Sequence, residues 1–276
     1  MKKYRITGRA FVAFCWPVIA LLLLPATAGA QAPWHAQLQT LPGAAVVLLG
    51  EQHDAPEHQE LARLSVQALA GAQRLSALVL EMADEGLSTE GMSAQSSEAL
   101  VRERLQWNQS GWPWRRYGPV VMQAVRAGAP VVGGNLPRAA MGAVMRDVQY
   151  DDKVTAAILA GHRQRMRDGH CGLLPESQVP AMARIQIARD ALMAQTVSKW
   201  VRDGQTVLLL AGAEHVKKDR GIPLFMPANS ASALSVVWMQ AATRTRLEPE
   251  LADVVWQTPP VPFKDHCAEL ATSKSK

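Results

Sequence analysis

Five short apolar segments constrain the fold of this chain more than any other feature of its sequence. Each is bounded by Gly, Pro or polar residues, as strands usually are. They are apolar at successive positions, which is typical of parallel strands buried on both faces rather than of half-exposed strands. The segments are Ala45–Leu49, Ala77–Glu81, Pro130–Gly133, Thr206–Ala211 and Ser235–Met239.

Helical segments alternate with these predicted strands, and the alternation predicts an α/β fold in which helices flank a mainly parallel sheet. Residues 138–203 contain no strand signal, so we expect an inserted helical lobe there. We expect residues 31–270 to form one domain and the Ser/Lys-rich residues 271–276 to be a disordered tail. The predicted helices are Pro56–Ala70, Ser97–Trp107, Arg115–Ala127, Asp152–Arg167 and Pro180–Arg202.

The first thirty residues have the pattern of a signal peptide. A basic start, Met1–Arg9, precedes an apolar run, Ala10–Leu24, and then the small-residue sequence Ala28-Gly29-Ala30. The apolar run is short compared with the roughly 20 residues of a membrane-spanning helix. We therefore expect export to the periplasm with cleavage after Ala30; the alternative is a retained membrane anchor.

The net charge of +5 comes mostly from this predicted signal. Residues 1–30 contain four basic residues and no acidic one, which leaves 25 basic and 24 acidic residues in the rest of the chain. Proteins that bind nucleic acid through its phosphates carry a basic surface. The near-neutral remainder predicts no nucleic-acid partner.

Polar residues follow four of the predicted strands. Glu51 and His53 follow the first strand, Glu81 ends the second, Asn135 follows the third and His215 the fourth. Functional sites of open α/β sheets form at the carboxyl ends of strands. We therefore predict one polar centre at this edge of the sheet, made by Glu51, His53, Glu81, Asn135, His215 and Asp219.

Two of these strand ends share the pattern Gly-x-x-His, with Gly50 before His53 and Gly212 before His215. Glycine allows a tight turn off the strand, and the histidine then faces the sheet edge. Together with Glu81 the two histidines could hold a divalent metal, with a neighbouring glutamate activating a bound water. The alternative is that each histidine caps a loop or packs against a helix.

Two cysteines, Cys171 and Cys267, remain after the predicted signal. In an exported chain a pair of cysteines suggests a disulfide. The alternative is two free buried thiols.

Four groups of residues resemble, in the same order, the ChaN family of haem-binding uptake proteins. This family belongs to the wider Tiki and erythromycin-esterase-like superfamily, and the resemblance spans about residues 40–265. The groups are Val46–Asp54; Trp114–Tyr117 with Gly134–Arg138; Gly169–Pro175 with Gln186 and Ala188–Asp190; and Gly212–His215 with Asp219–Pro223.

The resemblance implies a periplasmic protein of haem or iron uptake that binds haem, pairs as a dimer around it and works with an outer-membrane haem receptor system. It favours a disulfide between Cys171 and Cys267. Many members are lipoproteins, but this chain lacks the cysteine that would carry the lipid. Tiki-type metallopeptidases share the paired Gly-x-x-His and the strand-end Glu, so a metal-dependent peptidase or esterase is the alternative to a non-enzymatic haem carrier.

The hypothesis that the protein binds haem requires an axial ligand, a side chain that coordinates the haem iron. Tyr and His are among the residue types that do so. The candidates are Tyr117, Tyr150, His162 and His170, and Arg138 is a candidate partner for a haem propionate. Each has an alternative. Tyr117 could be a structural tyrosine, Tyr150 a half-buried residue at a helix start, and Arg138 part of a solvated face.

Overall fold

A six-stranded sheet forms the centre of the computed structural model, which describes residues 34, 36–39, 43–228, 233–242 and 248–274. The strands lie in the order β3-β2-β4-β1-β5-β6, and every pair of neighbours is parallel. The predicted α/β fold is confirmed, and the predicted signal lies outside the described residues. The strands are β1 (Val46–Glu51), β2 (Leu75–Asp84), β3 (Val131–Asn135), β4 (Thr206–Gly212), β5 (Leu234–Ala241) and β6 (Val254–Thr258).

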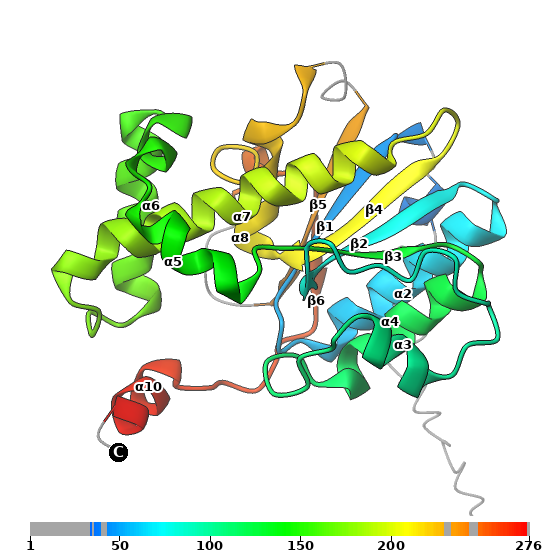
Figure 1. Ribbon diagram of the computed structural model, residues 1–276, viewed down its shortest axis with the longest axis horizontal. Helices are drawn as coiled ribbons and strands as arrows, with labels where there is room; N and C mark the ends of the chain where they lie inside the picture. Colours follow the sequence, from blue (N-terminus) through cyan, green and yellow to red (C-terminus); the bar gives the residue numbers. More distant parts are fainter. Residues whose placement is uncertain (1–33, 35, 40–42, 229–232, 243–247, 275–276) are drawn as a thin grey trace, which may run out of the picture.

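Helices cover both faces of the sheet (Figure 1). On one face lie α2 (Pro56–Gly71), α3 (Glu98–Arg104) and α4 (Trp114–Arg126). On the other face lies the carboxyl half of α7 (Val179–Trp200). Because successive strand residues point to opposite faces, Val47 and Leu49 enter the first core, whereas Val46 and Leu48 enter the second. This double burial explains why the strands are apolar throughout.

The five predicted strands agree with the structure to within a few residues, but β6 was not predicted. It is a short edge strand, and its residues Val254–Gln257 are half-buried or exposed, so it lacks the continuous apolar pattern of the others. The remaining short elements are α8 (Ala213–Val216), η4 (Ile222–Phe225) and η5 (Pro249–Leu251).

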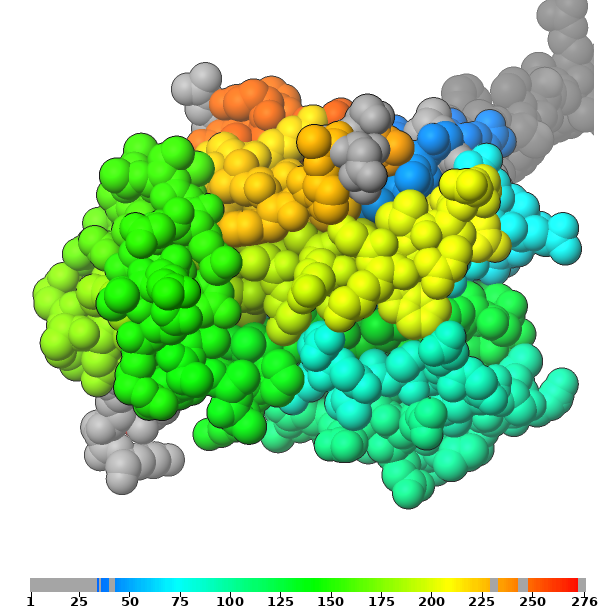
Figure 2. All heavy atoms as spheres, turned by 45° about the horizontal axis from the view of Figure 1, so that its top comes forward, coloured from blue at the N-terminus to red at the C-terminus, as the bar shows by residue number. Residues whose placement is uncertain are grey.

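The inserted helical lobe is confirmed, and it projects beyond one end of the sheet (Figure 1; green in Figure 2). It contains α5 (Arg138–Arg146), η2 (Val148–Lys153), α6 (Ala156–Gly169), η3 (Glu176–Gln178) and the amino half of α7. Arg184 of α7 ties these parts together. Its guanidinium donates to both carboxylate oxygens of Asp151 at 2.9 Å and to the carbonyl of Met145 at 2.8 Å.

The chain ends in a helix, α10 (His266–Lys274), that a disulfide joins to the lobe. Cys171 and Cys267 form this bond, with their Cα atoms 5.6 Å apart. Residues 271–274, which we expected in a disordered tail, belong to α10; the Asp265 carboxylate caps the helix by accepting from the backbone N–H of Ala268 at 2.9 Å. Among the described helices, none combines the length and apolarity that crossing a bilayer requires.

Candidate functional site

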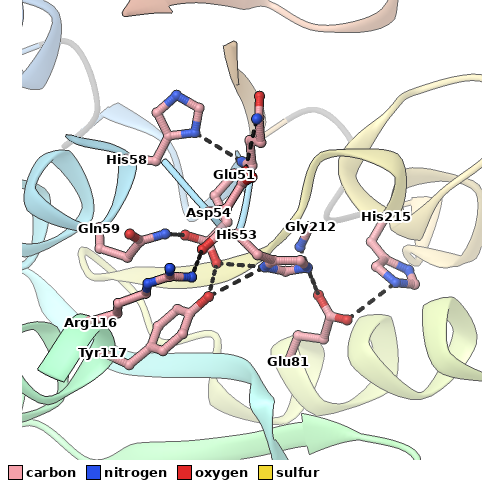
Figure 3. A network of polar contacts seen from close by, with 11 residues as sticks. Glu51, His53, Asp54, His58, Gln59, Glu81, Arg116, Tyr117, Gly212 and His215 are labelled. Carbon is pink, nitrogen blue, oxygen red and sulfur yellow. Dashed lines mark hydrogen bonds and ion pairs between the residues drawn. The ribbon is translucent and has the colours of Figure 1, made fainter. Parts of the chain in front are cut away.

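His53 lies at the carboxyl end of β1 and is oriented by the last residue of that strand. Its Nδ1 is 2.8 Å from Oε1 of Glu51, and the Tyr117 hydroxyl donates to the same oxygen at 2.8 Å (Figure 3). The second oxygen of Glu51 accepts from the Gln59 amide. Glu51 is fully buried, so three polar side chains, from the turn after β1, from α2 and from α4, satisfy a carboxylate that would otherwise be costly to bury.

His215 lies in α8, beyond the carboxyl end of β4, and contacts two buried carboxylates. Its Nδ1 is 2.5 Å from Oδ1 of Asp190 on α7, and its Nε2 is 3.5 Å from Oε1 of Glu81 at the end of β2. The other Glu81 oxygen accepts from the Gly212 backbone N–H at 2.7 Å and lies 3.9 Å from Nε2 of His53. Glu81 therefore sits between the two histidines (Figure 3).

The five side chains alternate in kind, and we call them the acid–histidine chain. In spatial order they are Asp190, His215, Glu81, His53 and Glu51. The side chain of His53 is 39% exposed, whereas those of the other four are at most 10% exposed. His53 is thus the end of the chain that solvent or a ligand reaches.

Within the acid–histidine chain, the carboxylates favour the protonated form of both histidines. Burial alone would lower the pKa of His215, but the Asp190 and Glu81 carboxylates raise it to about 10. Burial likewise opposes ionisation of Glu81, yet the two histidines and the Gly212 N–H hold its pKa well below the ordinary value. Burial raises the pKa of Asp190 to about 6, against the opposing effect of His215.

Similar forces act on the exposed end of the chain. Burial would lower the pKa of His53, but its hydrogen bond to Glu51 and the charge of Glu81 raise it above the ordinary value. Burial and the Glu51 carboxylate raise the pKa of Tyr117, so this phenol stays protonated and donates. The arrangement can accept, hold and release a proton at His53.

A cleft of about 630 Å³ opens beside the acid–histidine chain. His53 and His215 line it together with Trp238 and His266. His53 also packs edge-on against Trp112, with ring centroids 4.9 Å apart. Arg116 donates to the backbone carbonyl of His53 at 3.0 Å. Trp112 therefore holds the imidazole and Arg116 the backbone of His53, while the imidazole remains partly exposed at the cleft.

Two residues predicted for the polar centre lie elsewhere. Asn135 ends β3, which is separated from β4 and β1 by β2; its side chain accepts from the Leu136 N–H and lines a different cleft, of about 460 Å³. Asp219 lies in an exposed loop and pairs with Arg220 at 2.6 Å. The structure does not bring these two residues into the polar centre: Asn135 lies beside Asp84, three residues beyond Glu81 on β2, and Asp219 lies three residues beyond the end of α8.

The proposed metal ligands lie together, but they bind one another. Each histidine directs its Nε2 to a different oxygen of Glu81, at 3.9 Å for His53 and 3.5 Å for His215. Within the described part of the chain, no group of three or more His, Cys, Asp or Glu side chains has an arrangement that could hold a metal ion. The geometry gives no support to a divalent metal at His53, Glu81 and His215.

Sequence analysis missed two residues of this network. Asp190 lies within the segment Ala188–Asp190 that carries the family resemblance, so a signal was present, but its place in a long predicted helix gave no hint of a partner. Gln59 had no such signal. Tyr117 was considered a haem ligand or a structural tyrosine, and its hydroxyl donates to Glu51.

Gly212 offers a test of how tightly this network is packed. A Cβ at this position would lie 2.9 Å from Nε2 of His53 and 3.5 Å from Oε2 of Glu81. We expect Gly212→Ala to displace the half-exposed imidazole and lower the pKa of His53, with a loss of stability below about 1 kcal/mol. Proton NMR titration of His53 would measure the shift. An unchanged titration would contradict the close packing of the His53 imidazole against Gly212.

The remaining haem candidates all belong to the lobe. His162 is buried, its Nε2 lies 3.1 Å from the carbonyl of Arg220, and burial together with Arg165 lowers its pKa to about 4. His170 lies at the end of α6 beside the disulfide and bonds through Nδ1 to the carbonyl of Met166 at 2.8 Å. Both are occupied at one ring nitrogen by structural hydrogen bonds.

Tyr150 differs from the other candidates. It is half-buried in η2, and its hydroxyl makes no hydrogen bond to any described residue. Its ring packs on the lobe's own core, beside other partly buried apolar side chains that include Met141, Met145 and Met182. Arg138 is exposed at the start of α5. A hydroxyl without a hydrogen bond to a described residue and an apolar surface suit an axial haem ligand and its slot, and an exposed arginine can pair with a propionate.

The chain belongs to the family described as haem-binding uptake, Tiki superfamily, ChaN, whose model matches residues 37–226. Haem is the ligand of this family.

Among solved structures, the chain is similar to the one described as cofacial haem binding to ChaN of Campylobacter jejuni. The two share 23% identity with a TM-score of 0.63, over 79% of this chain and 89% of that one. This likeness confirms the fold. A type III effector, HopBA1, matches at 15% identity with a TM-score of 0.48, over 83% of this chain and 94% of that one. No curated protein sequence matches the chain.

Proposed function

We propose that this protein binds haem in the periplasm as part of haem and iron uptake. Family membership supports haem as the ligand, and the signal-like residues 1–30 support export. The Cys171–Cys267 disulfide agrees with an oxidising compartment. In this role the protein would receive haem from an outer-membrane receptor system and carry it onward.

Tyr150 is the axial ligand in this proposal, and the observation that carries it is the pairing of an unbonded hydroxyl with an apolar surface on the lobe. Tyr117 is excluded because its buried phenol donates to Glu51 and its pKa is raised. Haem would lie against the partly buried methionines near Tyr150, with Arg138 pairing with a propionate.

A second copy of the chain would cover the other face of the haem. Tyr150 and these methionines are partly buried and belong to the lobe, which projects beyond one end of the sheet (Figure 1). The related Campylobacter jejuni structure is described as cofacial haem binding. We therefore propose a homodimer that forms around haem, with the lobes in contact.

A hemin titration followed by absorbance tests the proposal. We expect a saturable Soret shift for the wild-type protein and an affinity at least roughly tenfold weaker for Tyr150→Phe, a loss of about 1.4 kcal/mol or more. Tyr117→Phe and His170→Ala are matched controls that should bind hemin as the wild type does. Light scattering during the titration should show the mass doubling.

The outcomes separate the parts of this proposal. A shift that never saturates would mean nonspecific adsorption and would contradict haem binding. Saturable binding that survives in Tyr150→Phe but is lost in His170→Ala would move the ligand to His170. Binding without a change of mass would contradict the dimer alone.

A further inference from the structure

Residues 259–274, the last that the structure describes, are covalently connected to the rest of the protein through β6 and through a disulfide. At one end they continue from β6, the edge strand of the sheet. At the other end Cys267, the second residue of α10, is bonded to Cys171, which lies in the turn between α6 and α7 of the lobe. The segment therefore bridges the sheet and the lobe, and we call it the strap (red in Figure 1).

The strap has little packing of its own. Residues 262–269 are all exposed, and Phe263 is 92% exposed. The contacts of Lys264 with Glu269 and of Asp265 with Ala268 lie within the segment itself. A segment with few buried contacts opens locally at little cost, so the disulfide is the strongest tie on its position.

The strap also forms part of the cleft beside the acid–histidine chain. His266, at the start of α10, lines that cleft, and its Nε2 lies 4.0 Å from Oδ2 of Asp54. Asp54 lines the same cleft directly after His53. The disulfide joins the residue next to His266, so it holds this wall of the cleft in place.

We propose that the disulfide latches the strap as one wall of the cleft and that its reduction widens the access to His53. A dithiol reductant supplies two electrons and two protons, which convert the bond to two thiols while the reductant becomes a disulfide. Cys267 is exposed, so a reductant reaches it. The latch is independent of whether the lobe binds haem.

Chemical modification of His53 tests this proposal. Diethyl pyrocarbonate acylates accessible imidazoles, and mass spectrometry of peptides reports each histidine separately. We expect His53 to react several-fold faster in Cys267→Ser, in Cys171→Ser and in wild-type protein treated with dithiothreitol than in oxidised wild type. His58, fully buried on α2, is the internal reference and should stay unreactive throughout.

An unchanged rate at His53 in all three reduced forms would overturn the proposal. A parallel increase at His58 would also overturn it, because the disulfide would then maintain the whole fold rather than the strap. His266→Ala with the disulfide intact should give a smaller increase than loss of the bond.

Discussion

Replacing Asp190 with asparagine should lower the free energy of unfolding by about 3–5 kcal/mol, the usual cost of removing one partner of a buried ion pair. Asp190 is 1% exposed, and its carboxylate lies 2.5 Å from Nδ1 of His215. In the variant, Glu81 at 3.5 Å would be the remaining carboxylate beside this imidazole. The pKa of His215 should fall accordingly.

Urea unfolding at pH 7, followed by circular dichroism, measures this effect. Asp219→Asn is the matched control, because Asp219 is exposed and its pair with Arg220 is a surface ion pair of the kind that contributes about 0–1 kcal/mol. A loss below about 1 kcal/mol for Asp190→Asn would contradict the ion pair between α7 and α8.

Stability should fall as the pH rises from neutral to about 10. The pKa of His215 is about 10 in the folded protein and near 6.5 when unfolded. A group whose pKa is raised by folding stabilises fully below the unfolded value and loses this contribution as the pH approaches the folded value. The window is therefore pH 6.5–10, with a slope of up to about 1.4 kcal/mol per pH unit and a total loss of a few kcal/mol.

Unfolding measured at intervals between pH 6 and pH 10 would reveal this slope. His215→Gln should be less stable than the wild type at pH 7 and should show a much flatter profile. Equal slopes in the two proteins would mean that His215 is not protonated in the fold. Glu81 acts in a separate window, since its lowered pKa gives stability that is lost only as the pH falls below about 4.5.

The sheet could be predicted because its strands are apolar at every position, whereas its order could not. The pattern around Val46–Glu51 and Thr206–Gly212 indicates parallel strands, and in the structure His53 and His215, which follow these strands, lie on either side of Glu81. Nothing in a single sequence states that β4 lies between β1 and β2. Nor does it state the register, which places Asn135 beside Asp84, three residues beyond Glu81.

The partners of the two histidines were harder to predict for a different reason. Asp190 and Tyr117 come from helices, where a polar residue facing inward looks like any other residue of an amphipathic pattern. Their roles depend on how α7 and α4 are rotated against the sheet. The apolar surface that we propose for haem was hard to predict for the same reason, because methionines on α5 and α7 are equally consistent with ordinary helix packing.

Helix α7 connects the lobe and the sheet mechanically. Its 22 residues, Val179–Trp200, run without interruption from the lobe onto the sheet, a length of about 33 Å at 1.5 Å per residue. Arg184 forms an ion pair with Asp151, the neighbour of Tyr150. Asp190, less than two turns further along the helix, forms an ion pair with His215. Because one continuous helix carries both ion pairs, the lobe cannot tilt against the sheet unless α7 bends or the Asp190 carboxylate moves relative to His215.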